Sequence, residues 1–235
     1  MIQGRHVLAI LAGILAILAT GLLLDWLATV KLGLPLSPFV QTIVVLGLPP
    51  LATLTSVLAI GHGRCGLPWS AFGFRRVGAS AILRAIGAWL LFLPVVAALI
   101  YAMFRITGAT AIGRQIQLIP ALGALEPWQM PILAALIAVA APVAEETLFR
   151  GVLFGWLRRH WPFWPSAFLS ALVFSLLHMI LEVMPPTIAL GLLFAWMYER
   201  SRSLWTPIAV HMVHNGVVFA VTLLALRQGV PLGGH

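Results

Sequence analysis

The stretch QMPILAALIAVAAPVAEETLFRGVLFGWL, residues 129–157, decides the fold class. It is almost wholly apolar and longer than the roughly 20 residues that a helix needs to cross the hydrocarbon core of a bilayer. A run of this length in lipid has to be helical, because lipid offers unpaired backbone groups no hydrogen-bond partner. The stretch therefore predicts a membrane-spanning helix, and the ionisable residues near its middle need an explanation.

The rest of the chain has the same apolar character. Of its 235 residues 61% are hydrophobic, and only 14 Lys and Arg and 6 Asp and Glu are charged. A surface that faces water carries many more charges, so an ordinary soluble domain is excluded. The net charge of +8 does not indicate nucleic acid as a partner, because the arginines are dispersed among hydrophobic stretches. We predict an all-α, polytopic membrane protein with lipid around it.

Hydrophobic stretches follow one another along the whole chain, at residues 7–28, 38–60, 80–104, 129–157, 163–182, 185–199 and 204–226. They predict a helical bundle of about seven transmembrane helices. We expect one membrane domain, residues 1–235, with three spans and their loops in residues 1–128 and a core in residues 129–226. Because more membrane segments follow the first stretch, we expect that stretch to be an uncleaved anchor and not a signal peptide.

The distribution of basic residues predicts the orientation in the membrane. Cytoplasmic loops carry an excess of Lys and Arg. If the N-terminus is cytoplasmic, nine basic residues lie on that side and four on the other. The nine are Arg5, Arg64, Arg75, Arg76, Arg84, Arg158, Arg159, Arg200 and Arg202, and the four are Lys31, Arg105, Arg114 and Arg227.

Two glutamates and an arginine lie close together near the middle of the 129–157 stretch. Glu146 and Arg150 are four residues apart and share one helix face, so they can form an ion pair. Glu145 is turned about 100° away from that face and is left without this partner. Charged groups at membrane depth are costly and usually face a cavity or a partner. We interpret Glu145 as a carboxylate that can take a proton from water.

Two later stretches carry polar residues at the same spacing. His178 follows Phe174 by four residues, and Asn215 follows His211 by four, so each pair is expected on one face of a helix. An imidazole can orient or deprotonate a water molecule. A second imidazole and an amide can donate hydrogen bonds to an oxyanion that develops on a carbonyl. Together with Glu145, these residues predict water-mediated acyl hydrolysis.

The three motifs Glu145-Glu146-xxx-Arg150, Phe174-xxx-His178 and His211-xxx-Asn215 resemble those of the CPBP family, also called the Abi family. That family contains type II CAAX prenyl endopeptidases and bacteriocin-processing or immunity-type membrane proteins. The resemblance covers about residues 130–226, so residues 129–226 are predicted to be a CPBP-like catalytic core. The first three stretches match only in being hydrophobic with a basic loop.

The resemblance implies an intramembrane glutamic endopeptidase, a hydrolase. In such an enzyme Glu145, helped by His178, would activate water, while His211 and Asn215 would stabilise the tetrahedral oxyanion. No cofactor and no metal are implied.

The remaining polar residues of the motifs are expected to act indirectly. Glu146 and Arg150 would be supporting residues that orient the site, because a buried ion pair can fix a helix without touching substrate. His214, beside Asn215, departs from the family pattern. We expect it to be a packing or lipid-interface residue.

The substrate implied by the resemblance is a membrane-associated peptide or protein, such as a prenylated CAAX protein. The expected location is a bacterial or archaeal cell membrane, as a multi-pass protein. The oligomeric state is left open.

Three other functions remain open. A zinc protease could use two histidines and a glutamate as ligands, although the HExxH pattern is absent. Glu182 lies four residues after His178, but we expect it to be solvated at a helix end. A non-catalytic scaffold or immunity-type protein could use the same polar cluster for binding, and a proton-coupled transporter could use Glu145 as a relay. The substitution Glu145→Gln would abolish proteolysis and leave a binding role largely intact.

Overall fold

The computed structural model describes residues 2–34, 36–108 and 126–228, and within these residues the chain is helical and has no strand. The α-helices are α1 (Gly4–Trp26), α2 (Pro38–Ser56), α3 (Ala79–Thr107), α5 (Met130–Ala135), α6 (Ala141–Glu146), α7 (Gly155–Leu157), α8 (Phe163–Leu176), α9 (Met184–Ser201) and α10 (Trp205–Arg227). The other helical segments are the π-helical η1 (Leu27–Lys31), η2 (Val57–Arg64), η4 (Leu136–Ala140) and η5 (Thr147–Phe154), and the 3-10 turn η3 (Trp69–Ala71). The predicted all-α class is confirmed.

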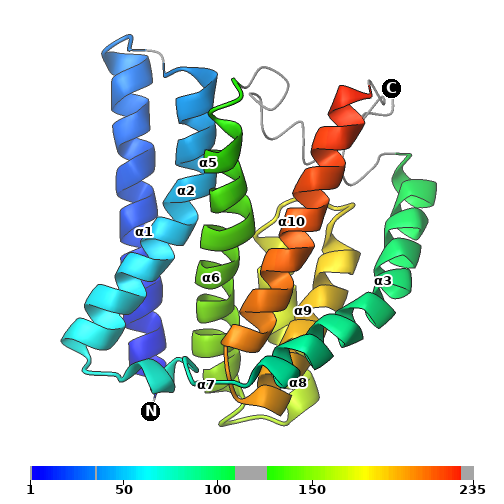
Figure 1. Ribbon diagram of the computed structural model, residues 1–235. Coiled ribbons are helices and arrows are strands. Elements are labelled where there is room, and N and C mark those ends of the chain that lie inside the picture. The colour runs from blue at the N-terminus through cyan, green and yellow to red at the C-terminus, as the bar shows by residue number, and fades with distance from the viewer. Residues whose placement is uncertain (1, 35, 109–125, 229–235) are drawn as a thin grey trace.

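Five continuous helical segments are long and apolar enough to cross a membrane, so the chain is an integral membrane protein. They are Gly4–Lys31, Pro38–Arg64, Ala79–Thr107, Met130–Leu157 and Trp205–Arg227. In Figure 1, α1 and α2 stand beside each other, and α5, α6 and α7 continue one another next to them. α10 follows on the other side of this central span, and α3 leans outward beyond it.

The predicted stretches 163–182 and 185–199 form a helical hairpin, α8 and α9, and are shorter than the five spans. α8 has 14 residues, which is about 21 Å at the usual rise per residue and less than the thickness of the hydrocarbon core. The prediction that this helix continues to residue 182 is wrong. Met179 has a φ of 50°, and the chain reverses there before α9 begins at Met184. Hydropathy does not register a reversal inside apolar surroundings.

Prolines and π-helical turns interrupt the regular geometry of the spans. Pro49 and Pro50 lie inside α2 and Pro94 lies inside α3. A proline removes one backbone hydrogen bond and its ring clashes with the preceding turn. Both helices change direction along their length in Figure 1. In the central span, η4 and η5 flank α6, and π-helical turns are frequent at functional sites.

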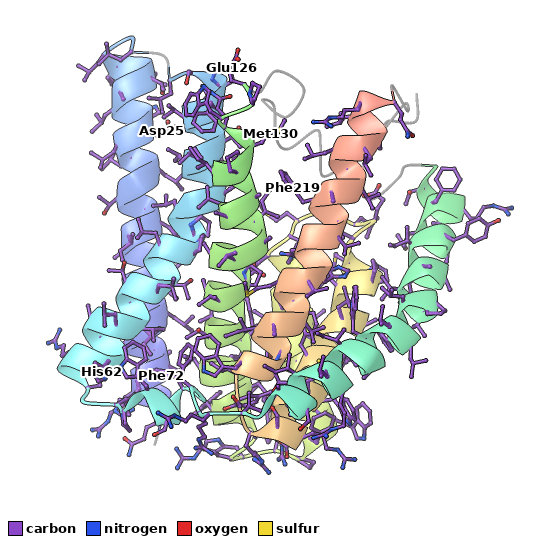
Figure 2. The ribbon with its side chains drawn as sticks, in the orientation of Figure 1. Asp25, His62, Phe72, Glu126, Met130 and Phe219 are labelled. Atoms are coloured by element: carbon purple, nitrogen blue, oxygen red, sulfur yellow. The ribbon has the colours of Figure 1, made fainter. Side chains whose placement is uncertain are left out.

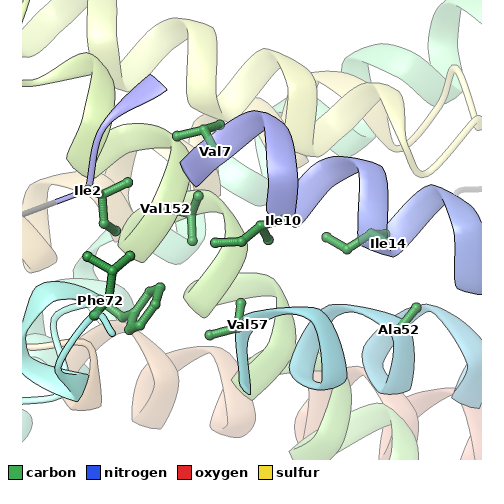
Figure 3. Close-up of a cluster of buried hydrophobic side chains, with 9 residues drawn as sticks. Ile2, Val7, Ile10, Ile14, Ala52, Val57, Phe72 and Val152 are labelled. Atoms are coloured by element: carbon green, nitrogen blue, oxygen red, sulfur yellow. The ribbon is translucent and has the colours of Figure 1, made fainter. Parts of the chain in front are cut away.

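The loop between α2 and α3 packs against the N-terminal helices. The buried Phe72 belongs to an apolar cluster with Ile10, Val57 and Val152, which come from four separate parts of the chain (Figure 3). The backbones approach so closely that a Cβ atom at Gly151 would lie 2.5 Å from the carbonyl oxygen of Phe72. Apolar packing therefore joins α1 and α2 to the central span.

The basic residues gather at the end of the bundle that holds the N-terminus. His62 and Phe72 mark this end in Figure 2, whereas Asp25, Glu126 and Met130 mark the opposite end. The nine arginines that the charge rule assigned to one side all lie at helix ends or loops of this end. Arg114, counted on the other side, lies outside the described residues.

Ion pairs join some of these arginines. Glu199 pairs with Arg158 at 2.9 Å and with Arg202 at 3.4 Å. Arg159 donates a hydrogen bond to the carbonyl oxygen of Ile2. These contacts link the ends of the central span and α9 to each other and to the N-terminus.

Candidate active site

α6 presents its two glutamates to different surroundings near the middle of the central span. The side chain of Glu146 is fully buried, whereas 31% of the Glu145 side chain is exposed. This difference follows from helix geometry, because consecutive residues point about 100° apart. Only one of the two carboxylates is therefore open to water or a ligand.

Glu146 and Arg150 form the ion pair that their spacing predicts. The Nη1 atom of Arg150 lies 2.8 Å from the Oε1 atom of Glu146, and both side chains are completely buried. Arg150 also donates from Nη2 to the carbonyl oxygen of Gly191 in α9, at 3.2 Å. Its guanidinium lies over the rings of Phe174 and Phe194, 4.8 and 5.3 Å from their centroids. The pair thus fixes α8 and α9 against the central span.

Gly191 allows this approach of α9. A Cβ atom at residue 191 would lie 2.7 Å from the Cβ atom of Ala171 in α8 and 3.3 Å from Nη2 of Arg150. A larger side chain would push α9 away from both neighbours. The position has no recognisable signal in the sequence, because its need for glycine arises only from the packing of two helices.

His211 of α10 lies between the two glutamates. Its Nδ1 atom is 2.9 Å from Oε1 of Glu146, and its Nε2 atom is 3.6 Å from Oε2 of Glu145. The ring stacks on Phe194 with 4.9 Å between the centroids. The place of Glu145 on the helix had suggested a carboxylate without a partner, but Glu145 lies against His211. Two adjacent carboxylates converge on one buried imidazole from another helix.

Asn215 lies one helical turn beyond His211 and is bound to the backbone of the central span. Its Nδ2 atom donates to the carbonyl oxygen of Ile137 at 3.0 Å. In η4 the N–H of Ala141 bonds to the carbonyl of Leu136, five residues back. Continuing that register would pair the carbonyl of Ile137 with Pro142, which has no N–H. The amide of Asn215 takes the place of the missing backbone donor.

His178 lies in the turn that follows α8 and not on the helix itself. The expectation that Phe174 and His178 share a helix face is wrong, because α8 ends at Leu176. The two residues are nevertheless in contact, since Nδ1 of His178 lies 3.0 Å from the carbonyl oxygen of Phe174. A carbonyl oxygen only accepts, so Nδ1 carries the hydrogen. In the neutral ring the Nε2 atom of His178 is then a proton acceptor.

A cavity of about 220 Å³ brings the later two motifs together. Its polar lining residues are Thr187 and the four side chains His178, His211, His214 and Asn215. Its other walls are mainly apolar and come from α3, α9, α10 and the turn after α8, including Val96, Leu190 and Val218. The site is thus a small polar patch at the end of an apolar pocket, an arrangement typical of small-ligand sites.

His214 contacts α3 from inside this cavity. The indole Nε1 atom of Trp89 donates to Nδ1 of His214 at 3.3 Å, and the two rings meet edge to face. We expected His214 to be a packing or lipid-interface residue, and that expectation did not foresee its hydrogen bond with Trp89. Trp89 lies in the third hydrophobic stretch, far from the motifs, and its spacing gives no sign of a link to α10.

Glu182 differs from its expected surroundings. Its relative exposure is only 7%, so the prediction of a solvated helix end is wrong. It lies in the turn between α8 and α9, beside the buried Val183. Among residues 2–34, 36–108 and 126–228, no group of three or more His, Cys, Asp or Glu side chains is arranged to hold a metal ion.

Comparisons with known proteins agree with the motifs. Residues 127–217 match the family model described as "Type II CAAX prenyl endopeptidase Rce1-like". The chain is 29% identical over 99 residues to "Putative membrane peptidase YdiL" of Bacillus subtilis (strain 168), covering 42% of this chain and 41% of that protein. It is 31% identical over 102 residues to "Membrane-embedded CAAX protease MroQ" of Staphylococcus aureus (strain USA300), covering 41% of each. No solved structure matches the chain.

The family match lies in the part of the chain that carries the site. The matched region spans about two fifths of each curated relative. Residues 127–217, which the family model matches, include all three motifs, and the resemblance to the CPBP family is confirmed. Residues 127–217 are therefore similar to the Rce1-like type II CAAX prenyl endopeptidases, a family of membrane proteins.

Proposed function

We propose that the chain is an intramembrane endopeptidase that hydrolyses a peptide bond of a membrane-associated substrate with water activated by Glu145. One observation carries the proposal. Two adjacent carboxylates converge on His211, and of the two only Glu145 is exposed. A carboxylate that is open on one side and paired with an imidazole on the other is suited to take a proton from water.

The proposed reaction begins with water between Glu145 and the substrate carbonyl. The water oxygen adds to the carbonyl carbon while Glu145 takes the proton, and the carbonyl oxygen becomes an oxyanion. When the C–N bond breaks, the protonated Glu145 returns a proton to the leaving nitrogen. His178 is proposed to assist, because its Nε2 atom can accept a hydrogen bond from the water and its ring lines the cavity.

His211 and Asn215 are proposed to stabilise the oxyanion from α10. Asn215 uses one N–H on the carbonyl of Ile137, and its amide nitrogen carries a second N–H that can be offered to substrate. The Nδ1 atom of His211 is bound to Glu146, but its Nε2 atom is 3.6 Å from Glu145, too far for a hydrogen bond, and can be offered to the oxyanion. Glu146 and Arg150 are proposed as positioning residues, because they are fully buried.

The proposed substrate is a lipid-associated peptide, for example one with a prenylated CAAX end. The apolar walls of the cavity favour a substrate with apolar groups beside the scissile bond. We propose a cytoplasmic N-terminus, because the arginine-rich end of the bundle is the end that holds it. A bacterial or archaeal cell membrane is the proposed location. Residues 1–128 are proposed as supporting spans and residues 129–226 as the catalytic core.

Cleavage of a fluorogenic prenylated CAAX peptide by the purified protein tests the proposal. Wild type, Glu145→Gln and the control Glu126→Gln, an exposed glutamate at the opposite end, are assayed with and without a zinc chelator. We expect wild type and the control to cut the peptide in both conditions and Glu145→Gln to lose at least ~100-fold in rate.

The other outcomes separate the alternatives. Loss of wild-type activity with the chelator would favour a zinc protease. Cleavage by Glu145→Gln at the wild-type rate would exclude Glu145 as the base. If wild type cuts neither this peptide nor a broader set of lipidated peptides, a non-catalytic binding protein becomes the better description.

A further inference from the structure

The bond between Trp89 and His214 determines which nitrogen of the histidine carries the hydrogen. The indole Nε1–H is a donor only, so Nδ1 of His214, 3.3 Å away, has to accept. In the neutral imidazole the hydrogen is then on Nε2. Trp89 is itself buried, with 4% exposure, so water does not readily replace its indole as the donor.

The Nε2–H of His214 has no partner among the described residues, and the ring lines the cavity of about 220 Å³. His178 lines the same cavity with the opposite arrangement. Its Nδ1–H is bound to the carbonyl of Phe174, which leaves Nε2 as an acceptor. The cavity therefore holds one imidazole fixed as an acceptor and another fixed as a donor, each by a bond to a group that cannot change its role.

The other polar groups of α10 are less available as donors. Both ring nitrogens of His211 lie next to carboxylate oxygens, at 2.9 and 3.6 Å. The amide of Asn215 gives one of its hydrogens to Ile137. His214 lines the cavity, and its Nε2–H has no hydrogen-bond acceptor among the described residues.

We propose that His214 is a further catalytic residue, which donates a hydrogen bond from Nε2 to the carbonyl oxygen of the scissile peptide bond, and that Trp89 is its positioning residue. The inference rests on the proposed endopeptidase function. The carbonyl oxygen gains negative charge when water adds, and the Nε2–H bond strengthens without proton transfer. The proton that leaves the water goes to Glu145, and from there to the leaving nitrogen.

Three substitutions of His214 test the donor itself with the fluorogenic prenylated CAAX peptide. His214→Gln keeps an N–H near the place of Nε2, whereas His214→Asn keeps polar atoms only near the place of Nδ1, and His214→Phe keeps neither. We expect His214→Phe and His214→Asn to lose ~10²-fold to 10³-fold in kcat, with a small change in KM, and His214→Gln to recover part of the loss. Equal rates for His214→Phe and His214→Gln, or no loss of rate in either variant, would overturn the catalytic role of His214.

The substitution Trp89→Phe tests the positioning role, with Trp164→Phe at an exposed position of α8 as its control. We expect Trp89→Phe to lower kcat in the wild-type background but to have no further effect in His214→Phe, because it acts through His214. An equal loss in both backgrounds would mean that Trp89 only supports the fold.

Nitrogen chemical shifts of ¹⁵N-labelled histidine give a readout that does not depend on cleavage. In nanodiscs, wild-type His214 should show the Nε2–H form, and Trp89→Phe should show a mixture of the two neutral forms. A wild-type signal from the Nδ1–H form would overturn the inference even if the enzyme is active. A wild type that cuts no peptide would overturn the proposed function and the catalytic role together, while the shifts would still decide whether Trp89 sets the tautomer.

Discussion

The first two helices and the helices around the site are held in place by different kinds of contact. α1, α2 and the loop after them meet through aliphatic and aromatic side chains such as Ile10, Val57 and Phe72. Around α6, by contrast, Glu146, Arg150 and His211 form a connected polar group at no more than 5% side-chain exposure. Apolar packing tolerates changes that conserve volume, whereas a buried polar group requires all of its partners. Precise positioning is therefore needed around α6 and less so between α1 and α2.

Removing the guanidinium should reveal this difference most strongly. Arg150→Met would leave the Glu146 carboxylate buried beside His211 without its cation. We expect a loss of about 3–5 kcal/mol in the free energy of unfolding, because an unpaired buried charge is costly. This loss is measured by unfolding the purified protein with SDS and monitoring the helix content by circular dichroism.

The control is Arg76→Met, which removes the same charge from an exposed position. It should change the free energy of unfolding by less than about 0.5 kcal/mol. Equal stability of the two variants would show that the buried pair does not hold the helices together.

Asn215→Ala tests the account of the interrupted backbone. It should cost about 1–3 kcal/mol, because the carbonyl of Ile137 would lose its donor. The double substitution Pro142→Ala with Asn215→Ala restores a backbone N–H at residue 142, so it should be more stable than Asn215→Ala alone. SDS unfolding of the single and double variants measures the difference.

A matched control for Asn215 is Gln41→Ala, which removes an exposed hydrogen bond of 3.2 Å from the side-chain amide to the carbonyl oxygen of Leu36. It should be nearly neutral in stability. If Pro142→Ala fails to improve Asn215→Ala, the missing proline N–H is not the reason that the amide is needed.

The smallest effect is expected in the apolar region. Ile10→Val removes one methylene from a completely buried side chain. It should lower the free energy of unfolding by about 0.5–1.5 kcal/mol and leave the rate of peptide cleavage unchanged. A marked loss of cleavage at normal stability would contradict the separation of the two regions.

Local features of the structure could be predicted from the sequence. All seven hydrophobic stretches contain helices, because long apolar runs in lipid permit little else. The Glu146–Arg150 pair follows from a four-residue spacing on one helix. Both predictions depend only on neighbours along the chain.

Features that depend on contacts between distant segments could not be predicted in this way. The contact of His211 with both glutamates depends on how α10 lies against α6. The bond from Asn215 to Ile137 depends on a π-helical turn before Pro142, which hydropathy does not indicate. The end of α8 at Leu176 and the burial of Glu182 arise from a chain reversal within the bundle.

The two neighbouring glutamates have different roles in this proposal, and their variants can be compared in the same preparation. Cleavage of the fluorogenic peptide and SDS unfolding are measured for Glu145→Gln and Glu146→Gln. We predict that Glu145→Gln is as stable as wild type and loses ~10²-fold to 10⁴-fold in rate, whereas Glu146→Gln is destabilised by about 3–5 kcal/mol because Arg150 loses its carboxylate. Wild-type cleavage by Glu145→Gln, or normal stability of Glu146→Gln, would contradict the division of roles between these two residues.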